Sequence, residues 1–260
     1  MLRFGDKKKI IGMVHLPPLP GKSGYKGMNH VMKSGLRDAR NLEQGGIDAI
    51  LVENYGDMPF SVKVSKETVA AMTMACCEIK KIVDVPVGVN VLRNDWEAAL
   101  GIAKVLNLDF IRVNVYTGVT ATEQGIIEGE AAQIHRYKNA LDIKAGILAD
   151  IHVKHGDQIY PKDIVKGSRD AVIRGKADGI IISGEETGTP VDLVELKRAK
   201  DSVQAPVLIG SGLTVNNAIN VLKNSDGAIV GTSIKENQDI HNPVSVEKVK
   251  ELMDEVRSIS

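Results

Sequence analysis

The chain has 260 residues, 43% of them hydrophobic and 3% aromatic, and its 33 basic residues balance 33 acidic ones. About 250 residues is the typical size of a (β/α)8 barrel, and an aliphatic core suits the Val, Ile and Leu layers of a parallel barrel. The charge balance argues against broad nucleic-acid binding, because neutralising phosphates requires a basic excess on one face. We therefore expect one domain over residues 1–260 and no nucleic-acid partner.

Cysteine content and hydropathy indicate the compartment. Cys76 and Cys77 are adjacent in a helical pattern and lack the spacing of zinc ligands, which suits a reducing environment. The basic N-terminal stretch contains an apolar run too short for a signal peptide, and no later run approaches the ~18 apolar residues of a membrane helix. We expect a soluble, cytoplasmic protein without membrane insertion.

Strand patterns alternate with helix patterns along the whole chain. An apolar run over 10–14 predicts a strand, the Pro- and Gly-rich segment 16–27 predicts a long loop, and a helical pattern over 31–44 stops at Gly45 and Gly46. The next strands are predicted over 47–52, 87–91, 110–115, from 146, and over 178–182, 207–209 and 227–230. The next helices are predicted over 66–82, from 96, and over 128–139, 161–174, 191–200, 215–222 and 244–256, with a Thr- and Gly-rich loop over 116–125.

Eight strand and helix pairs without a linker predict the fold class. Strands separated by single helices imply right-handed crossovers and a parallel sheet. A doubly wound sheet usually carries a G-x-G-x-x-G turn after its first strand, whereas segment 16–27 is proline-rich. The prediction is an α/β protein with a single (β/α)8 TIM barrel.

One stretch carries an acid, a base and an amine. Alternation along the strand that begins at residue 146 would place Asp150, His152 and Lys154 on one face. Asp150 and His152 could form an acid/base pair, and Lys154 could be an electrostatic anchor or a Schiff-base nucleophile. A purely structural polar network is the alternative, because such groups also pair with one another when buried.

Polar residues follow most of the predicted strands. In a barrel these positions open onto the mouth where active sites lie. The catalytic candidates are His15, Glu53, Asp95, Arg112, Asp150, His152 and Lys154. The substrate-binding candidates are Asn54, Asn90, Asn114, Ser183 and Gly184. Each has a structural alternative, and Asn94 or Asp95 could simply cap the helix that follows.

The last two strands end in small residues, which predicts a phosphate site. The loops after strands seven and eight of many barrels bind phosphate, because small residues let backbone N–H groups approach an anion. The candidates here are Gly210, Ser211, Gly212, Gly231, Thr232 and Ser233. Tight turns with ordinary Gly and Ser chemistry are the alternative.

The sequence requires no cofactor, although a divalent metal ion is possible. Carboxylates and imidazoles are suitable ligands, and the candidates are Glu53, Asp150, His152 and His155. No spacing specific to a metal site accompanies them.

Several motifs together resemble the BtpA/SgcQ family over nearly the whole chain. They are IGMVHLPPLPG (11–21), VENYGDMPF (52–60), NVLRND (90–95), RVNV (112–115), ADIHVKH (149–155), Ser183-Gly184 with Thr187-Gly188, and the small-residue segments 210–212 and 231–233. Two positions depart from the family pattern: Tyr55-Gly56 follows Asn54, and Trp96 stands where a small residue is usual. The resemblance implies a ribulose-phosphate-binding type of barrel, with relatives that act in photosystem I accumulation or accompany sugar metabolism.

Two functions follow as expectations. The first is an enzyme for a phosphorylated sugar or nucleotide-like small molecule, of the isomerase, lyase or nucleosidase type, in which Asp150 and His152 exchange protons while Lys154, Arg112 and Glu53 orient the substrate or stabilise charge. The second is a non-catalytic binding or assembly factor, as the resemblance implies. The expected partner is a phosphorylated small molecule, and we expect a homo-oligomer.

Overall fold

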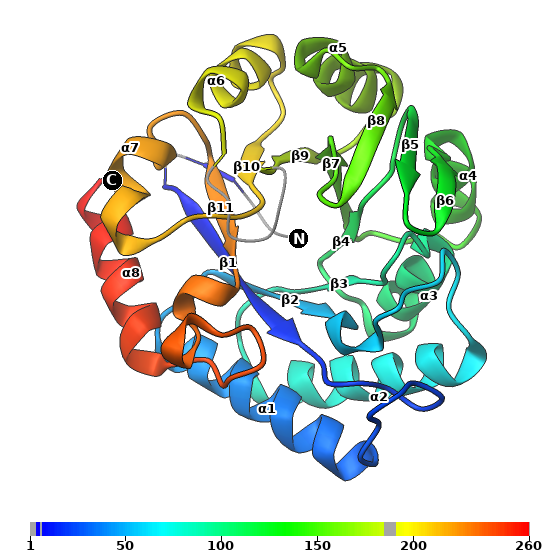
Figure 1. Ribbon diagram of the computed structural model, residues 1–260, viewed down its shortest axis with the longest axis vertical. Coiled ribbons are helices and arrows are strands. Elements are labelled where there is room, and N and C mark those ends of the chain that lie inside the picture. Colours follow the sequence, from blue (N-terminus) through cyan, green and yellow to red (C-terminus); the bar gives the residue numbers. More distant parts are fainter. Residues whose placement is uncertain (1–3, 6, 185–190, 260) are drawn as a thin grey trace.

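The computed structural model describes residues 4–5, 7–184 and 191–259. Eight parallel strands form a closed barrel around the centre of the molecule (Figure 1). They are β1 (Lys9–His15), β2 (Ala49–Glu53), β3 (Val87–Asn90), β4 (Phe110–Val113), β7 (Gly146–Ile151), β9 (Gly179–Ile182), β10 (Val207–Ile209) and β11 (Gly227–Val230). Strand β1 pairs with both β2 and β11, which closes the sheet. The predicted TIM barrel is therefore confirmed.

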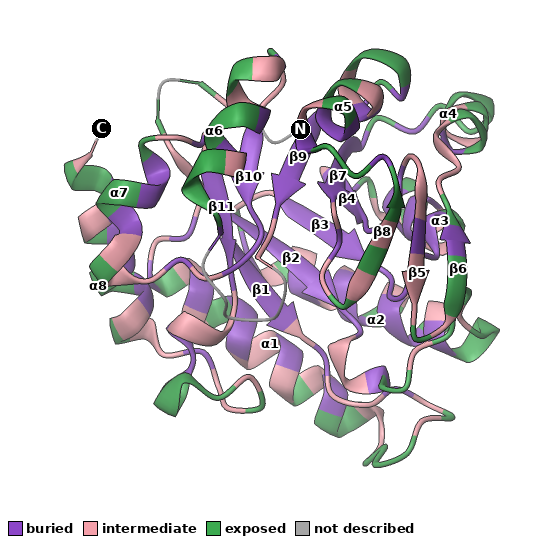
Figure 2. Ribbon diagram, turned by 45° about the horizontal axis from the view of Figure 1, so that its top comes forward, coloured by how far each residue is buried: buried purple, intermediate pink, exposed green. Residues whose placement is uncertain are grey.

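Helices surround the barrel and bury one face each against it (Figure 2). They are α1 (Met28–Gln44), α2 (Lys66–Ile82), α3 (Trp96–Leu106), α4 (Ala131–Ala140), α5 (Ile164–Arg169) with the π-helical turn η2 (Asp170–Arg174), α6 (Leu193–Ser202), α7 (Ala218–Leu222) and α8 (Val246–Ser258). Short 3-10 turns are η1 (Tyr55–Asp57), η3 (Val215–Asn217), η4 (Thr232–Ile234) and η5 (Glu236–Gln238). None of these helices is long and apolar enough to cross a membrane, as far as the described residues go.

Alternation along the strands separates two apolar cores. Ile11 and Met13 of β1 point into the barrel, whereas Ile10 and Val14 point outward and pack under the helices. Fully burying such a side chain contributes about 1.5–3 kcal/mol. This alternation matters for function, because the next residue in the inward phase of β1 is His15, at the open end of the barrel.

A three-stranded antiparallel sheet lies beside the barrel mouth. Its strands are β5 (Val119–Thr122), β6 (Gly125–Glu128) and β8 (Gly156–Tyr160), in the order β6-β5-β8. The hairpin β5-β6 is inserted between β4 and α4, and β8 is inserted between β7 and α5 (Figure 1). The expected loop over 116–125 and helix from 128 are therefore wrong in part, since residues 119–128 pair as a hairpin and α4 begins at Ala131.

Candidate active site

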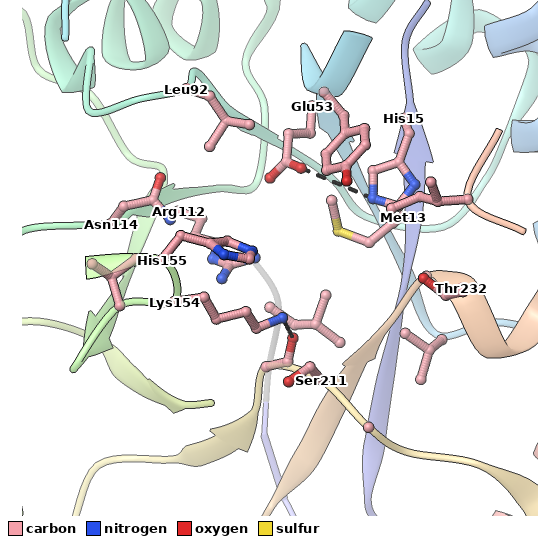
Figure 3. A pocket seen from close by; sticks show the side chains of 18 of the residues that line it. Met13, His15, Glu53, Leu92, Arg112, Asn114, Lys154, His155, Ser211 and Thr232 are labelled. Carbon is pink, nitrogen blue, oxygen red and sulfur yellow. Dashed lines mark hydrogen bonds and ion pairs between the residues drawn. The ribbon is translucent and has the colours of Figure 1, made fainter. Parts of the chain in front are cut away.

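A cavity of about 640 Å³ opens at the carboxyl ends of the barrel strands. Figure 3 shows side chains from several strands converging on it. Of the residues predicted for the site, it is lined by His15, Glu53, Arg112, Asn114, Lys154, His155, Gly210, Ser211, Gly212, Gly231, Thr232 and Ser233. This is the face on which TIM barrels carry their active sites, and the volume suits a small molecule.

Four of the polar residues lie at one level of the barrel. The pairing register places His15 beside Glu53, Glu53 beside Asn90, and Asn90 beside Arg112 on neighbouring strands. All four side chains face inward, one inward-facing position beyond the apolar interior of the barrel. The apolar interior therefore ends in a polar layer. Strand register alone therefore brings these side chains together from four separate segments of the chain.

An ion pair buried within the barrel fixes Arg112. Its Nε and one terminal nitrogen each lie 3.0 Å from the carboxylate oxygens of Asp150, a bidentate geometry. Asn114 donates to the same carboxylate at 2.7 Å, and Asn90 donates to Asn114 at 3.0 Å. Burial alone would lower the pKa of Arg112, but the carboxylates of Asp150 and Glu53 raise it. Arg112 is thus a permanent cation at the cavity wall, and Asp150 is the group that holds it.

His15 and Glu53 face each other across the cavity wall, with 3.9 Å between Nε2 and Oε1 (Figure 3). Burial, aided by Lys235 and Lys154, lowers the pKa of His15 well below its ordinary value, so the imidazole is neutral at neutral pH. Burial raises the pKa of Glu53, although Arg112 opposes the shift. The Nδ1 atom of His15 is buried and has no hydrogen-bond partner in the part of the chain that the structure describes. Together they form a proton donor and acceptor pair that faces a ligand-sized space.

Lys154 extends from the loop after β7 toward the loop after β10 (Figure 3). Its Nζ donates to the carbonyl oxygen of Gly210 at 3.0 Å. Burial and the charge of Arg112 lower the pKa of Lys154 to about 8, against the opposing effect of Asp150 and Glu53. An amine with this pKa is a cation in most molecules at neutral pH.

The two small-residue loops meet on one side of the cavity, as the sequence predicted. Gly231 leaves room for its neighbour, since a Cβ there would lie 2.8 Å from Cε1 of His15. Gly212 has a φ of +76°, a backbone conformation that residues other than glycine adopt only with strain. The positions are those expected of a phosphate site, and phosphate binding itself stays a prediction.

The expected alignment of Asp150, His152 and Lys154 along one strand is wrong. Strand β7 ends at Ile151, and His152 has a φ of +57°, so the strand alternation stops before it. The Nε2 of His152 instead lies 3.1 Å from the carbonyl oxygen of Pro161. Asp150 and His152 line a separate cavity of about 10 Å³, room for about one water molecule. The predicted acid/base pair therefore does not face the large cavity.

Asn54 and Asp95 have structural contacts and do not line the cavity. Asn54 accepts from the backbone N–H of Leu92 at 2.7 Å and donates to Asp57 at 3.1 Å, which ties the end of β2 to the loop after β3. Asp95 caps α3 by accepting from Ala98 at 3.1 Å. Capping was the alternative for Asp95, and the structure favours it over the expected catalytic position.

Ser183 and Gly184 line a neighbouring cavity rather than the one described above. The two spaces are separated near Gly210, where an added Cβ would lie 2.2 Å from Oγ of Ser183. The predicted loop continues through Thr187 and Gly188, which lie outside the described residues.

The candidate metal ligands do not converge. Within residues 4–5, 7–184 and 191–259, no three His, Cys, Asp or Glu side chains are arranged to hold an ion. Glu53 and His155 line the large cavity, whereas Asp150 and His152 face the small one. These four residues therefore do not form one ligand set.

Several residues of the large cavity were not expected from the sequence. They are Arg93, Glu123, Tyr55, Met58 and Phe60. Arg93 stands two residues before Asp95 in the NVLRND motif, so its position after a strand was a usable signal. Glu123 reaches the cavity from the turn of the β5-β6 hairpin, which the sequence did not reveal.

The fold and the site define a TIM-barrel protein with a small-molecule cavity at its carboxyl-terminal mouth. Its fold is similar to that of thiamine phosphate pyrophosphorylase from Pyrococcus furiosus, with a TM-score of 0.63, 15% identity and 98% of both chains covered. It is also similar to (S)-3-O-geranylgeranylglyceryl phosphate synthase from Thermoplasma acidophilum in complex with sn-glycerol-1-phosphate, with a TM-score of 0.63, 17% identity, and 97% and 94% of the chains covered. At these identities the likeness concerns the fold alone.

The chain belongs to the BtpA family, which residues 6–258 match. It is 44% identical to an uncharacterised protein of Pyrococcus horikoshii, with 98% of both chains covered. It is 40% identical to the photosystem I biogenesis protein BtpA of Synechocystis, covering 97% of this chain and 90% of that protein. It is 29% identical to the putative sgc region protein SgcQ of Escherichia coli, covering 98% and 97%. The family resemblance is therefore confirmed.

Proposed function

We propose that this protein is an enzyme acting on a phosphorylated small molecule of the sugar or nucleotide type. The observation that carries the proposal is a single cavity of about 640 Å³ that both small-residue loops line together with His15, Glu53 and Lys154. Cavities with a few convergent polar groups are typical of small-molecule sites, and titratable groups with shifted pKa values in them favour catalysis. The family relatives and the structures of similar fold do not name the reaction.

The small-residue loops after β10 and β11 bind the phosphate in this proposal. Backbone N–H groups near Gly212 and Gly231 can approach an anion closely because no side chain intervenes. Lys154, whose Nζ lies 3.0 Å from the carbonyl oxygen of Gly210, adds a positive charge beside them. Similar fold in enzymes named for phosphorylated compounds supports this placement by analogy only.

Glu53 transfers the proton in this proposal. Burial raises its pKa, and a carboxyl group whose pKa approaches the working pH can both donate and accept a proton. The neutral imidazole of His15 positions that proton or relays it, and Arg112 stabilises negative charge that develops on a substrate oxygen. Isomerisation, aldol-type cleavage and glycosidic cleavage all need these two actions, so the geometry supports the class rather than one member.

A second function is a binding or assembly factor without catalysis. It is favoured by the 40% identity to a protein named for photosystem I biogenesis. The two functions differ in their need for Glu53. A binding factor retains its affinity for its partner when Glu53 is replaced by Gln, whereas an enzyme of the proposed type loses at least about a hundredfold in turnover.

The phosphate site can be tested by thermal unfolding with inorganic phosphate, ribose 5-phosphate and adenosine monophosphate. A ligand at 100 times its dissociation constant stabilises by about 2.7 kcal/mol, which is about 5–10 °C for a chain of this length. Thr232→Asp places a carboxylate at the site and should abolish the shift. Gln204→Glu adds the same charge at the exposed residue before β10 and should leave it unchanged. Absence of a shift with every phosphorylated compound would contradict the proposal.

A further inference from the structure

Arg93 is a buried cation without a carboxylate partner in the described part of the chain. Only 6% of its surface is exposed. One terminal nitrogen donates to the carbonyl oxygens of Lys154 and His155, and Nε has no hydrogen-bond partner among the described residues. Arg112, by contrast, has the carboxylate of Asp150. A buried charge without a counter-ion is costly, by several kcal/mol, so the position calls for an anion.

The nearest carboxylates are committed elsewhere. Asp150 holds Arg112 with two nitrogens. The charge of Glu123 raises the pKa of Arg93, but the two form no ion pair among the described residues, and the raised pKa of Glu53 makes that carboxyl group a poor counter-ion. Burial outweighs all three and lowers the pKa of Arg93. The carbonyl contacts explain how the side chain is held, but they leave its charge unbalanced.

Arg93 lines the large cavity on the side away from the small-residue loops. It follows β3, and in the closed order β1-β11-β10-β9-β7-β4-β3-β2 strand β3 lies across the barrel from β10. Figure 3 shows the adjacent Leu92 on the opposite side of the cavity from Ser211 and Thr232. Leu92 and Phe60 are apolar neighbours on this wall, and an apolar surround strengthens the attraction between opposite charges.

We propose that Arg93 binds a second acidic group of the substrate, a carboxylate or a second phosphate, across the cavity from the phosphate loops. The inference rests on the proposed function and narrows it: the substrate is a phosphorylated acid or a bisphosphate rather than a molecule with one anionic group. The N–H groups of the planar guanidinium that the two carbonyl oxygens leave unused form the fork offered to such a group, since the buried Nε is out of reach of a ligand.

Isothermal titration calorimetry with matched ligand pairs tests this proposal. The pairs are glycerol 3-phosphate with 3-phosphoglycerate, and sorbitol 6-phosphate with 6-phosphogluconate, which differ by one carboxylate at two chain lengths. The protein should bind at least one acid tenfold or more tightly than its partner. Arg93→Gln should remove that preference and change the affinity for the singly phosphorylated partner by no more than about twofold.

Further variants make the result specific. Arg93→Lys keeps a charge but loses the fork, and it should retain part of the preference if Arg93→Gln does not fold. Lys63→Met removes a half-exposed cation that lies beside Asp95, outside the cavity. This variant should retain the full preference for the acid. Thr232→Asp should weaken both members of each pair, because it acts on the phosphate. Binding without preference for either acid, or a preference that survives Arg93→Gln, would overturn the role of Arg93 and leave the phosphate site standing. No binding of any of the four ligands would overturn both proposals.

Discussion

Replacing Asp150 by Asn tests whether this residue positions Arg112. The side chains of Arg112 and Asp150 are 8% and 1% exposed, and three hydrogen bonds join them, at 3.0, 3.0 and 3.3 Å. Two charges about 4 Å apart at an effective dielectric constant of ~20 attract by about 4 kcal/mol, and breaking a buried pair costs about 3–5 kcal/mol. Because Asn keeps an acceptor for Arg112, we expect a loss near the lower end, about 3 kcal/mol in the free energy of unfolding.

Thermal unfolding at neutral pH, followed by near-ultraviolet circular dichroism, measures this loss. A cost of about 3 kcal/mol lowers Tm by roughly 6–12 °C for a protein of this size. Asp201→Asn is the control, since the pair of Asp201 with Lys197 is 63% and 64% exposed and contributes less than about 1 kcal/mol. Adding Arg112→Met to Asp150→Asn should cost less than the two single changes combined. An Asp150→Asn variant as stable as Asp201→Asn would refute the role assigned to the pair.

Three further predictions concern individual residues. The rate of acetylation of Lys154, followed by peptide mass spectrometry across pH, should be half-maximal near pH 8. Glu53→Gln should move this midpoint to lower pH, because the carboxylate of Glu53 raises the pKa of Lys154. Since the unfolded chain binds this proton up to about pH 10.5, the contribution of Lys154 to stability should rise with pH between about 8 and 10.5; a fall of the unaltered protein relative to Lys154→Met across this window would contradict the shift. Asn54→Ala should lower the free energy of unfolding by about 2–3 kcal/mol, by removing its bonds to Leu92 and Asp57, while phosphate affinity changes less than about twofold.

The barrel and most of its polar layer follow from alternation in short apolar segments. Every second residue of a strand faces inward. The last inward-facing residues of β1, β2 and β4 are His15, Glu53 and Arg112, and they can be identified from each strand alone. The small residues after β10 and β11 meet for the same reason, because parallel strands end at one edge.

The residues placed wrongly depend on where a strand ends. Alternation through ADIHVKH put His152 in phase with Asp150, but left-handed backbone conformations at His152 and again at His155 turn the chain away from the strand direction. His rarely adopts this conformation, and nothing local in the sequence requires it. Asn54 and Asp95 show the related difficulty: a polar side chain after a strand can face the mouth or bond the neighbouring loop, and only the distance to Leu92 or Ala98 decides.

The charges of the cavity are unequal, and this inequality favours an anionic substrate. Arg93, Arg112 and Lys154 line it as cations and Glu123 as a carboxylate, whereas Asp150 is paired with Arg112 and the pKa of Glu53 is raised. The lowered pKa values of His15 and Lys154 have the same origin, since nearby positive charges add to burial in each case. A phosphate beside Lys154 and an acidic group beside Arg93 would reverse these shifts, so ligand binding and protonation of the site are thermodynamically linked. A substrate that carries both groups would therefore raise the pKa of Lys154 and keep it a cation during the reaction.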